Sequence, residues 1–483
     1  MSGACANTRV RALFFPARNP FKSGARGPIY IAMDAQQHIT GQTILAERWI
    51  TTQPTNGGDA ARVADAVAAR TYTIGDKIAS GTFCSVYECA PCDSPTEHHS
   101  DCAVVKIFGS ARQFRRTIFA MRALDRTLAT TAGARDYVER VDGFGSAIAH
   151  STLRAAHALE TIPFVIMPRY EMRLKDFIRE HVAQFDAGLP ALATLTIAKN
   201  LFLALDALQA AGIVHGDIKP GNIMIRAAPA FDAKTVTSLD TILCDFGSAR
   251  ELARADLLQP ACVGTIPFIA PEILIGRPYS HGADIWSAMA TIFSIITGDN
   301  LFDVYGEDGA DYGFDLTGLA VASDASSREA SPSLAHDSRS ADSDSCCADT
   351  ESRGDDVADD IDFPMFYAHV VLMWRVIGKP PEIFCGDHRA REFYHNGVPR
   401  YHRALESGTI TQFMSANYHN INRNQMTQIE EFLRLGLQYM DADREHARTI
   451  LAHQFLDPVF ARARATSATP APSHPRAGKK RKT

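Results

Sequence analysis

The chain has 483 residues, of which 46% are hydrophobic and 22% charged, a composition typical of a folded protein with a substantial core. No uninterrupted apolar run is long enough to cross a bilayer, and ten irregularly spaced cysteines without a secretory signal favour free thiols over a disulfide framework. The net charge of −6 arises from acids gathered in residues 303–362, so the charge of the whole chain indicates no particular partner.

Residues 1–70 are expected to form a flexible basic extension. The first 33 residues contain no acid but several bases, among them Arg9 and Lys22, which resembles an organellar presequence. A disordered arm, or an extension upstream of a start at Met33, are the alternatives. The Thr-, Gly- and Ala-rich stretch 51–70 is typical of a linker.

Secondary structure is predicted from Tyr72 onward. Short β-type runs cover 72–79, 84–90 and 102–108, a helical stretch covers 111–130, and further strands are expected at 137–145 and 164–170. Downstream of residue 190 the pattern is mostly helical. A β-rich lobe followed by an α-rich lobe is an α+β arrangement with a cleft between the two.

Two segments of biased composition divide the rest of the chain. Residues 304–362 are rich in Ser, Asp and Ala and are expected to be a disordered acidic insert, and 461–483 a flexible basic tail. The predicted folded parts are therefore 71–170, 171–303 and 363–460.

The stretch "IVHGDIKPGNIMI" at 213–225 places three polar groups between apolar flanks. Asp217 could accept a proton from a hydroxyl nucleophile, Lys219 could neutralise a phosphoryl oxygen, and Asn222 could ligate a metal. A second carboxylate, Asp245, follows in "CDFGSA". Each residue taken alone also fits a turn or a solvated loop.

Taken in order, D-x-K-x-x-N, D-F-G and "APE" at 270–272 resemble the catalytic loop, metal loop and activation segment of protein kinases, from about Tyr72 to Phe460. The resemblance implies a two-lobed kinase fold, the substrates ATP and protein hydroxyls, and Mg²⁺. It assigns Asp217 and Lys219 to catalysis, and Asn222 and Asp245 to the metal. Lys219 and the segment "GTIPFIAPE" resemble the serine/threonine class.

The resemblance also implies a nucleotide site. In "IASGTFCSV" at 78–86 only the middle glycine of the glycine-rich loop is kept, with Ala79 and Cys84 at the outer positions. "AVVK" resembles the strand that carries the phosphate-binding lysine. The implied ATP-site residues are Ile78, Ala79, Gly81, Val86, Ala103, Lys106, Asp125, Met167 and Tyr170.

Asp125 is expected to be the acid that pairs with Lys106, because the helix at 111–130 contains no Glu and Asp125 is its only acid. Two further contacts are implied by the resemblance. Asp284 is expected to hold the backbone of the catalytic loop, and Glu272 to pair with Arg448.

Gly216 stands where most protein kinases carry an Arg that pairs with a phosphorylated activation loop. No Ser, Thr or Tyr lies between Ser248 and Thr265, so both halves of that switch are missing. We therefore expect activity that does not depend on phosphorylation of this loop. Thr265 itself matches the residue that contacts the catalytic Asp and Lys.

The second lobe resembles the SR-protein kinases in "PEILIGRPYSHGADIWS" and "LMWRVIGKPPEIF". That resemblance implies Arg/Ser-rich substrates docked by Asp303, Glu307, Asp308 and Asp311, although a solvated acidic loop is the alternative reading of these acids.

Two other clusters in the sequence have competing interpretations. Cys89, Cys92, His98, His99 and Cys102 have the ligand types of a zinc site, but an ordinary loop between strands explains them equally. "KKRK" at 479–482 resembles a nuclear-localisation patch, although short basic tails are common.

The sequence as a whole predicts a monomeric cytoplasmic or nuclear serine/threonine protein kinase, with no membrane or direct nucleic-acid binding. The alternative is a pseudokinase that serves as a nucleotide-binding or scaffold module, favoured by Ala79, Cys84, Asp125 and Gly216. A small-molecule kinase is disfavoured by the "APE" segment and the long helical lobe that follows it.

Overall fold

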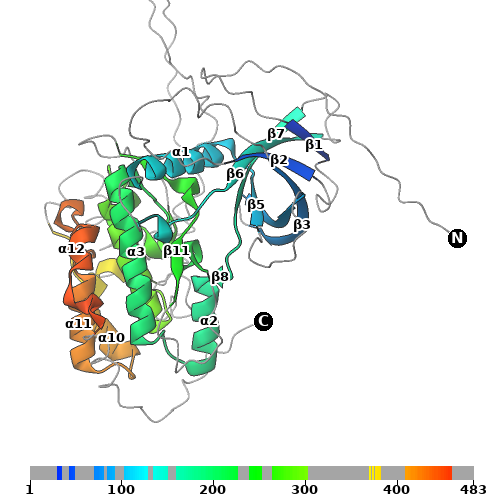
Figure 1. Ribbon diagram of the computed structural model, residues 1–483. Helices are drawn as coiled ribbons and strands as arrows, with labels where there is room; N and C mark the ends of the chain where they lie inside the picture. The colour runs from blue at the N-terminus through cyan, green and yellow to red at the C-terminus, as the bar shows by residue number, and fades with distance from the viewer. Residues whose placement is uncertain are drawn as a thin grey trace, which may run out of the picture.

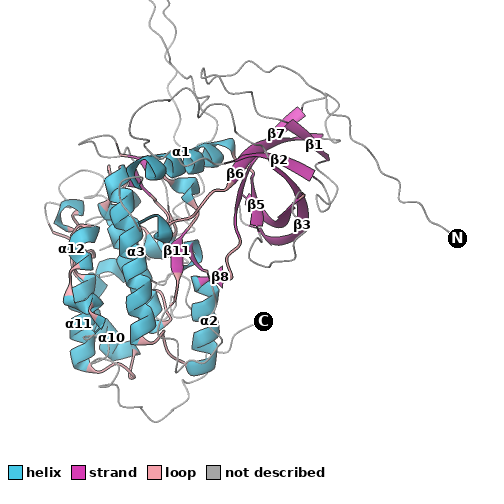
Figure 2. Ribbon diagram, in the orientation of Figure 1, coloured by secondary structure: helices cyan, strands magenta, loops and turns pink. Residues whose placement is uncertain are grey.

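The structure is a computed structural model. It describes residues 30–34, 43–48, 70–80, 84–92, 103–128, 134–150, 159–226, 239–252, 264–302, 369–370, 372–374, 376–381 and 408–458. These residues form a β-sheet unit and a mainly helical unit (Figures 1 and 2). The predicted insert 304–362, the tail 461–483 and all four proposed docking acids, Asp303 among them, lie outside the described residues.

The sheet unit contains seven strands in the order β1-β6-β2-β3-β4-β5-β7, with additional pairing between β6 and β7. The pairings β6-β2-β3-β4-β5-β7-β6 therefore make a closed ring of strands, and β1 adds to β6 outside the ring. The strands are β1 (Tyr30–Asp34), β2 (Thr43–Arg48), β3 (Arg70–Ser80), β4 (Cys84–Pro91), β5 (Ala103–Phe108), β6 (Gly143–His150) and β7 (Leu159–Pro168).

Two of these strands lie in the segment that was expected to be a flexible extension, so that expectation is wrong for β1 and β2. β2 pairs antiparallel with both β3 and β6, and β1 pairs parallel with β6. The sequence "TILAER" alternates in the way that a half-buried strand requires. Ile44 and Ala46, two residues apart, point to the same face and are each 1% exposed.

The strands expected from Tyr72 onward are present, with one difference. Where a strand was expected at 137–145, a 3₁₀ turn η3 (Ala134–Tyr137) is followed by Val138, which makes a single parallel bridge to Leu243 of the helical unit. The strand β6 begins only at Gly143. The intervening residues follow the helical unit before the chain returns to the sheet, which is why their apolar pattern does not produce a strand.

The expected helix at 111–130 is α1 (Ala111–Leu128), and it packs against both β5 and β7 of the sheet and α3 of the helical unit (Figure 1). The helical unit itself contains α2 (Leu174–Phe185), α3 (Ala191–Ala211), α4 (Pro271–Leu274), α5 (Gly282–Thr297), α10 (Ile410–Asn417), α11 (Arg423–Leu433) and α12 (Ala447–Leu451).

Five short strands complete the helical unit, namely β8 (Met172–Arg173), β9 (Ile213–Val214), β10 (Ile223–Ile225), β11 (Thr241–Leu243) and β12 (Arg250–Glu251). They form two small sheets, β11-β10-β8 and β12-β9. Because β9, β10 and β11 each end or begin beside a predicted catalytic motif, these small sheets set the positions of the motif loops.

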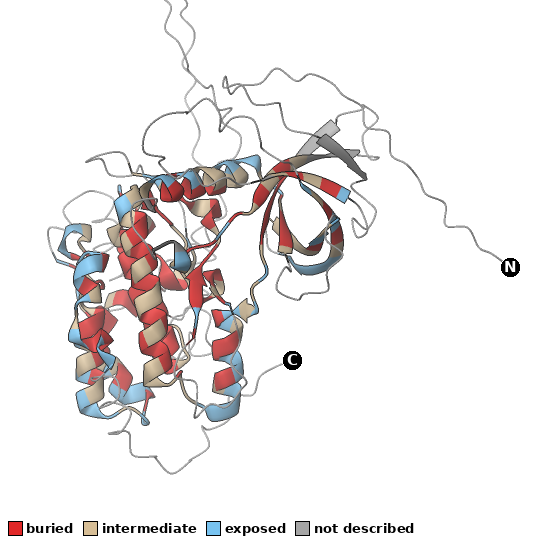
Figure 3. Ribbon diagram, viewed as in Figure 1, coloured by how far each residue is buried: buried red, intermediate tan, exposed pale blue. Residues whose placement is uncertain are grey.

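The core of the helical unit is built around α3 and α5. Trp286, Met289 and Phe293 of α5 are fully buried. Figure 3 shows buried residues, in red, along the helices of this unit. Among the described residues, α3 is long and apolar enough to cross a membrane by length and composition, but 61% of its most apolar window is buried inside the protein. That degree of burial is typical of a core helix.

Candidate active site

A buried carboxylate holds the backbone of the loop that contains Asp217. Asp284, in the first turn of α5, accepts hydrogen bonds from the backbone N–H groups of His215 at 2.6 Å and Gly216 at 2.9 Å. This confirms the role expected of Asp284. Burial raises the pKa of the Asp284 carboxyl above its usual value, although the nearby His215 and the two N–H donors act in the opposite direction.

Gly216 has a local reason to be glycine. Its φ of +78° lies in the left-handed region, and a Cβ atom there would come within 3.3 Å of the Ser248 carbonyl oxygen. Glycine adopts this conformation without the steric cost of a side chain. The residue thus allows the reversal that follows β9 and presents Asp217 to the site.

Three side chains contact the carboxylate of Asp217. Lys219 Nζ donates to Oδ2 at 2.8 Å, Asn222 Nδ2 donates to Oδ2 at 2.9 Å, and the Thr265 hydroxyl donates to Oδ1 at 2.8 Å. Lys219 Nζ also donates to the Thr265 oxygen at 2.6 Å. The expected contact of Thr265 with both Asp217 and Lys219 is confirmed, and the carboxylate of Asp217 is held through both of its oxygens.

The predicted metal ligands have a donor set that fits a hard cation. The side-chain amide nitrogen of Asn222 donates to the Asp217 backbone carbonyl at 2.7 Å as well as to the Asp217 carboxylate. The side-chain amide oxygen of Asn222 is therefore the atom that can face a metal. Asp245 contributes carboxylate oxygens. Carboxylate and amide oxygens are the ligands that Mg²⁺ prefers.

Asp245 follows β11 and has an unusual backbone. Its φ of +68° and ψ of +71° are left-handed, and it precedes the 3₁₀ turn η5 (Phe246–Ser248). Phe246 is fully buried with its ring centroid 4.8 Å from that of His215. The backbone N–H of Asp245 donates to Glu139 Oε2 at 2.9 Å.

Lys106 on β5 is 6% exposed and donates to Asp245 Oδ1 at 2.7 Å. Burial alone would lower the pKa of this lysine, but the carboxylates of Asp245 and Glu139 outweigh burial and raise it. For Asp245, burial would raise the pKa of the carboxyl, and the nearby Lys106 ammonium lowers it instead. Both groups are therefore held in their charged forms.

The predicted ion pair between Lys106 and Asp125 is wrong. The ion pair of Lys106 is with Asp245, and the second carboxylate acting on it is that of Glu139. Asp125 on α1 is 6% exposed. The signal that could have found Glu139 is an acid set directly after a buried valine, Val138, in "YVERV".

The strands bring three of the predicted nucleotide-site residues into one row. In the sheet register Ala79 pairs with Val86, and Val86 pairs with Lys106, so these three side chains form one row on one face. Met167 is buried at the end of β7, opposite Val104.

Ala103, by contrast, is wrongly assigned to the nucleotide site. It is an odd number of residues from Lys106, so it faces the other side of β5, where it packs against the cluster that contains Ile74 and Val105. Val104 shares the face of Lys106 instead.

The remaining predicted nucleotide residues differ in their surroundings. Ile78 is 45% exposed, and Tyr170 is partly buried against the main core. Gly81 lies outside the described residues. Cys84 follows the undescribed residues 81–83 and is a free thiol. Burial raises the pKa of this thiol, although the nearby Lys106 acts in the opposite direction.

The acid of the "APE" segment has a different partner from the one expected. Arg444 donates to Glu272 through both terminal nitrogens at 2.6 Å, and its side chain is fully buried. Arg448, the predicted partner, is 80% exposed and pairs with Asp206 at 3.1 Å. The two arginines are four residues apart in sequence, and Arg444 is the one that is buried.

The predicted zinc cluster is only partly described. Cys89 is buried in the sheet core, and burial raises the pKa of its thiol to about 12, whereas Cys92 is exposed with its sulfur 3.2 Å from the Thr73 hydroxyl. His98, His99 and Cys102 lie outside the described residues. Within the part of the chain that the structure describes, no three His, Cys, Asp or Glu side chains gather as a metal site.

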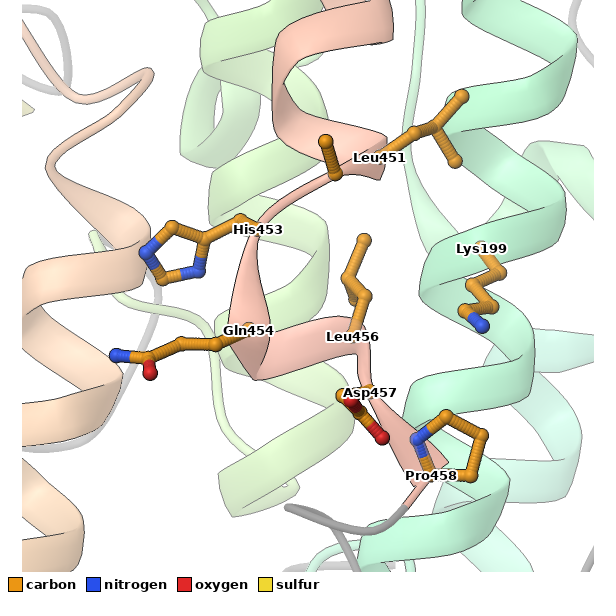
Figure 4. Close-up of a pocket in the computed structure, with 8 residues that line it drawn as sticks. Lys199, Leu451, His453, Gln454, Leu456, Asp457 and Pro458 are labelled. Atoms are coloured by element: carbon orange, nitrogen blue, oxygen red, sulfur yellow. The ribbon is translucent and has the colours of Figure 1, made fainter.

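A shallow pocket of about 250 Å³ lies elsewhere in the helical unit, where residues 451–458 pass α3 (Figure 4). Lys199 and Asp457 are among the residues that line it. None of the predicted catalytic or nucleotide residues lines this pocket, so it is separate from the site around Asp217.

Comparison with known proteins agrees with the arrangement of the site. Residues 158–346 match the family model of the protein kinase domain, a range that contains Asp217, Lys219, Asn222 and Asp245. The chain is 33% identical over 138 residues to serine/threonine-protein kinase prpf4B of Dictyostelium discoideum, which covers 29% of this chain and 15% of the relative.

Two further relatives carry the same class name. Serine/threonine-protein kinase US3 of Human herpesvirus 1 is 32% identical over 139 residues, covering 28% of this chain and 26% of the relative. Serine/threonine-protein kinase ATG1a of Arabidopsis thaliana is 28% identical over 236 residues, covering 48% and 32%. The chain thus spans less than a third of the length of each of these relatives. These matches show that residues 158–346 are similar to the protein kinase domain, and that the similar relatives are serine/threonine-protein kinases.

Proposed function

We propose that this chain is an ATP-dependent serine/threonine protein kinase. The observation that carries the proposal is the carboxylate of Asp217, which is contacted by Lys219, Asn222 and Thr265. An acid in a solvated turn would be hydrogen-bonded mainly by water, whereas the Asp217 carboxylate accepts from three side chains. An acid held in this way is oriented to receive the proton of a substrate hydroxyl.

In the proposed reaction a serine or threonine hydroxyl of a protein attacks the γ-phosphorus of ATP. A bond forms between the hydroxyl oxygen and phosphorus, the bond from phosphorus to the bridging oxygen breaks, ADP departs, and Asp217 accepts the hydroxyl proton. Lys219 neutralises negative charge on the transferring group. Mg²⁺, which Asn222 and Asp245 would hold, neutralises charge on the phosphate oxygens when bound.

The two structural units support the finer reading of the fold as two kinase lobes. On this proposal β1–β7 with α1 form the nucleotide-binding lobe, and residues from 171 onward form the substrate lobe. Lys106 contributes the cation of the first lobe and contacts Asp245 of the second. The pair joins the lobes at the point where phosphates would bind.

We further propose protein substrates rich in Arg and Ser, and a cytoplasmic or nuclear location. The support is the resemblance of the second lobe to SR-protein kinases and the acids at 303–311. The alternative of a pseudokinase rests on Ala79, Cys84, Asp125 and Gly216. Against it, the left-handed backbone of Gly216 favours glycine, Lys106 contacts Asp245, and Lys219 contacts Asp217.

The test compares Asp217→Asn with Asp245→Asn in a radiolabelled-ATP assay on a peptide array that includes Arg/Ser-rich sequences. Asp217→Asn should lower phosphoryl transfer by about 10²–10⁴-fold while leaving nucleotide affinity largely intact, since it addresses the hydroxyl. Asp245→Asn should weaken Mg·ATP binding as well.

Asp240→Asn is the matched control, because Asp240 is a half-exposed acid outside the site that pairs with Arg226 at 3.7 Å. It should behave as the wild type. If wild-type protein with Mg·ATP labels no peptide and no protein substrate, the proposal fails and the pseudokinase reading gains.

A further inference from the structure

The left-handed backbone of Asp245 needs something to hold it. Among the described residues, Asp186 and Asp245 are the non-glycine residues with positive φ. Such a conformation is sparsely populated and persists when surrounding contacts determine it. For Asp186, the residue after the last turn of α2, a backbone bond to the Val182 carbonyl supplies the contact. Asp245 does not cap a long helix, and its own N–H points to Glu139.

Glu139 is tied to the strand that precedes Asp245. Its backbone N–H donates to the Leu243 carbonyl at 2.8 Å, and its Oε2 accepts from the Asp245 N–H at 2.9 Å. Two hydrogen bonds from one residue thus bracket Cys244. Glu139 is 1% exposed, so its side chain is held by packing as well as by these bonds.

Asp245 is thus held at two points from two different segments. Lys106 Nζ on β5 contacts the Asp245 carboxylate at 2.7 Å, and Glu139, which precedes β6, accepts from the Asp245 backbone N–H at 2.9 Å.

We propose that Glu139 is the positioning residue that fixes the backbone of Asp245. The inference rests on the proposed kinase function of this site. It predicts that Glu139 acts through Asp245, with no contact of its own to the substrate.

The experiment uses full-length protein and a fluorescent ATP analogue, titrated with Mg²⁺ under conditions without turnover. Glu139→Ala removes the acceptor of the Asp245 N–H, whereas Glu139→Gln keeps an oxygen acceptor there. The half-saturating Mg²⁺ concentration should rise about tenfold in Glu139→Ala, as expected when a group that orients a metal ligand is lost. In Glu139→Gln it should stay within about twofold of the wild type, because the acceptor is kept.

A second measurement does not need nucleotide. Glu139→Ala removes the acceptor as well as the charge, so the buried N–H of Asp245 loses its partner. Its thermal midpoint should fall below that of Glu139→Gln by about 2–4 °C. Equal midpoints would overturn the backbone role of Glu139.

The nucleotide titration separates this inference from the proposal on which it rests. Wild-type protein that binds the analogue with Mg²⁺, together with a Glu139→Ala variant of unchanged Mg²⁺ requirement, would overturn the inference alone. A rise in Glu139→Gln as large as that in Glu139→Ala would also overturn it, because the acceptor for the Asp245 N–H is kept in the Gln variant. Wild-type protein that does not bind the analogue would overturn the kinase proposal and this inference with it.

Discussion

Arg444 is the cation that joins the "APE" segment to the C-terminal part of the chain. Its guanidinium makes two parallel bonds to Glu272, lies 5.3 Å from the Trp286 ring centroid, and also donates from Nε to the Gln438 carbonyl at 2.9 Å. A planar guanidinium suits this combination of a bidentate acid and an aromatic face, which a lysine ammonium cannot reproduce. Removing one partner of a buried ion pair lowers the free energy of unfolding strongly, because the other charge remains buried without a partner.

Arg444→Ala should therefore lower the free energy of unfolding by about 3–5 kcal/mol, because Glu272 would remain buried without its partner. Arg448→Ala should lower it by about 1 kcal/mol or less, because that arginine is exposed. The free energies are measured by denaturant titration of both variants beside the wild type. Equal losses in the two variants would contradict the assignment of the pair.

Among single residues, the sequence predicted the contacts that form within one short motif. Asp217, Lys219 and Asn222 lie within six residues, so their spacing nearly determines how they meet. The partners of Lys106 and Glu272 come from distant segments, and several acids or arginines at suitable positions compete for each. Which of Arg444 and Arg448 faces the core depends on how the segment packs, and the sequence pattern does not contain that information.

Among the elements, β2 has the largest consequence for the sheet. It pairs with β3 along one edge and with β6 along the other, and Ile44 and Ala46 fill the sheet core beside Tyr72 and Ile74. On α1, Arg122 lies 5.8 Å from the ring centroid of Phe144, which pairs with Glu47 of β2. β2 thus supports both the ring of strands and the helix that packs on it.

Ile44→Ala should lower the free energy of unfolding by about 2–4 kcal/mol, since a fully buried isoleucine is truncated. Ile78→Ala is the matched control, with the same change at a side chain that is 45% exposed, and should cost about 1 kcal/mol or less. Thermal and denaturant unfolding check both. An Ile44→Ala variant as stable as the control would show that β2 is not part of the folded sheet.

The strands β3, β4, β5 and β7 and the helix α1 could be predicted because each has a clear local period. β2 is as regular, but it lies in the segment 1–70, which is expected to be a flexible extension, and its partner strands β3 and β6 lie further along the chain. Alternation shows that a segment can be a strand, and long-range pairing decides whether it is one. The first part of the 137–145 segment failed in the opposite sense, because Val138 bridges to Leu243 of the helical unit and the strand β6 begins only at Gly143.

For the whole molecule, the arrangement around Asp217 bears on regulation. The loop backbone is held by Asp284 and the left-handed Gly216, with no cation at position 216 that would need a phosphate. The residues between Leu252 and Gly264, including Leu257 and Leu258, lie outside the described part of the chain, and the sequence between Ser248 and Thr265 contains no hydroxyl side chain.

Enzyme made in bacteria and treated with phosphatase should therefore be as active as untreated enzyme. Activity is measured with Mg·ATP and the best peptide from the array, before and after treatment. A drop of about tenfold or more, equivalent to about 1.4 kcal/mol in the barrier, would contradict the prediction and indicate a phosphosite elsewhere.

The closed ring of strands also decides where this protein can be shortened. A fragment that begins at residue 158, where the family match starts, would keep β7 alone of the seven strands in the large sheet. A fragment that begins at Tyr72 would remove β1 and β2 and leave β3 and β6 with exposed hydrogen-bonding edges. Open edges of this kind pair readily with other chains. Recombinant fragments cut at either boundary should therefore self-associate, whereas those that retain residues from 43 onward keep the ring closed.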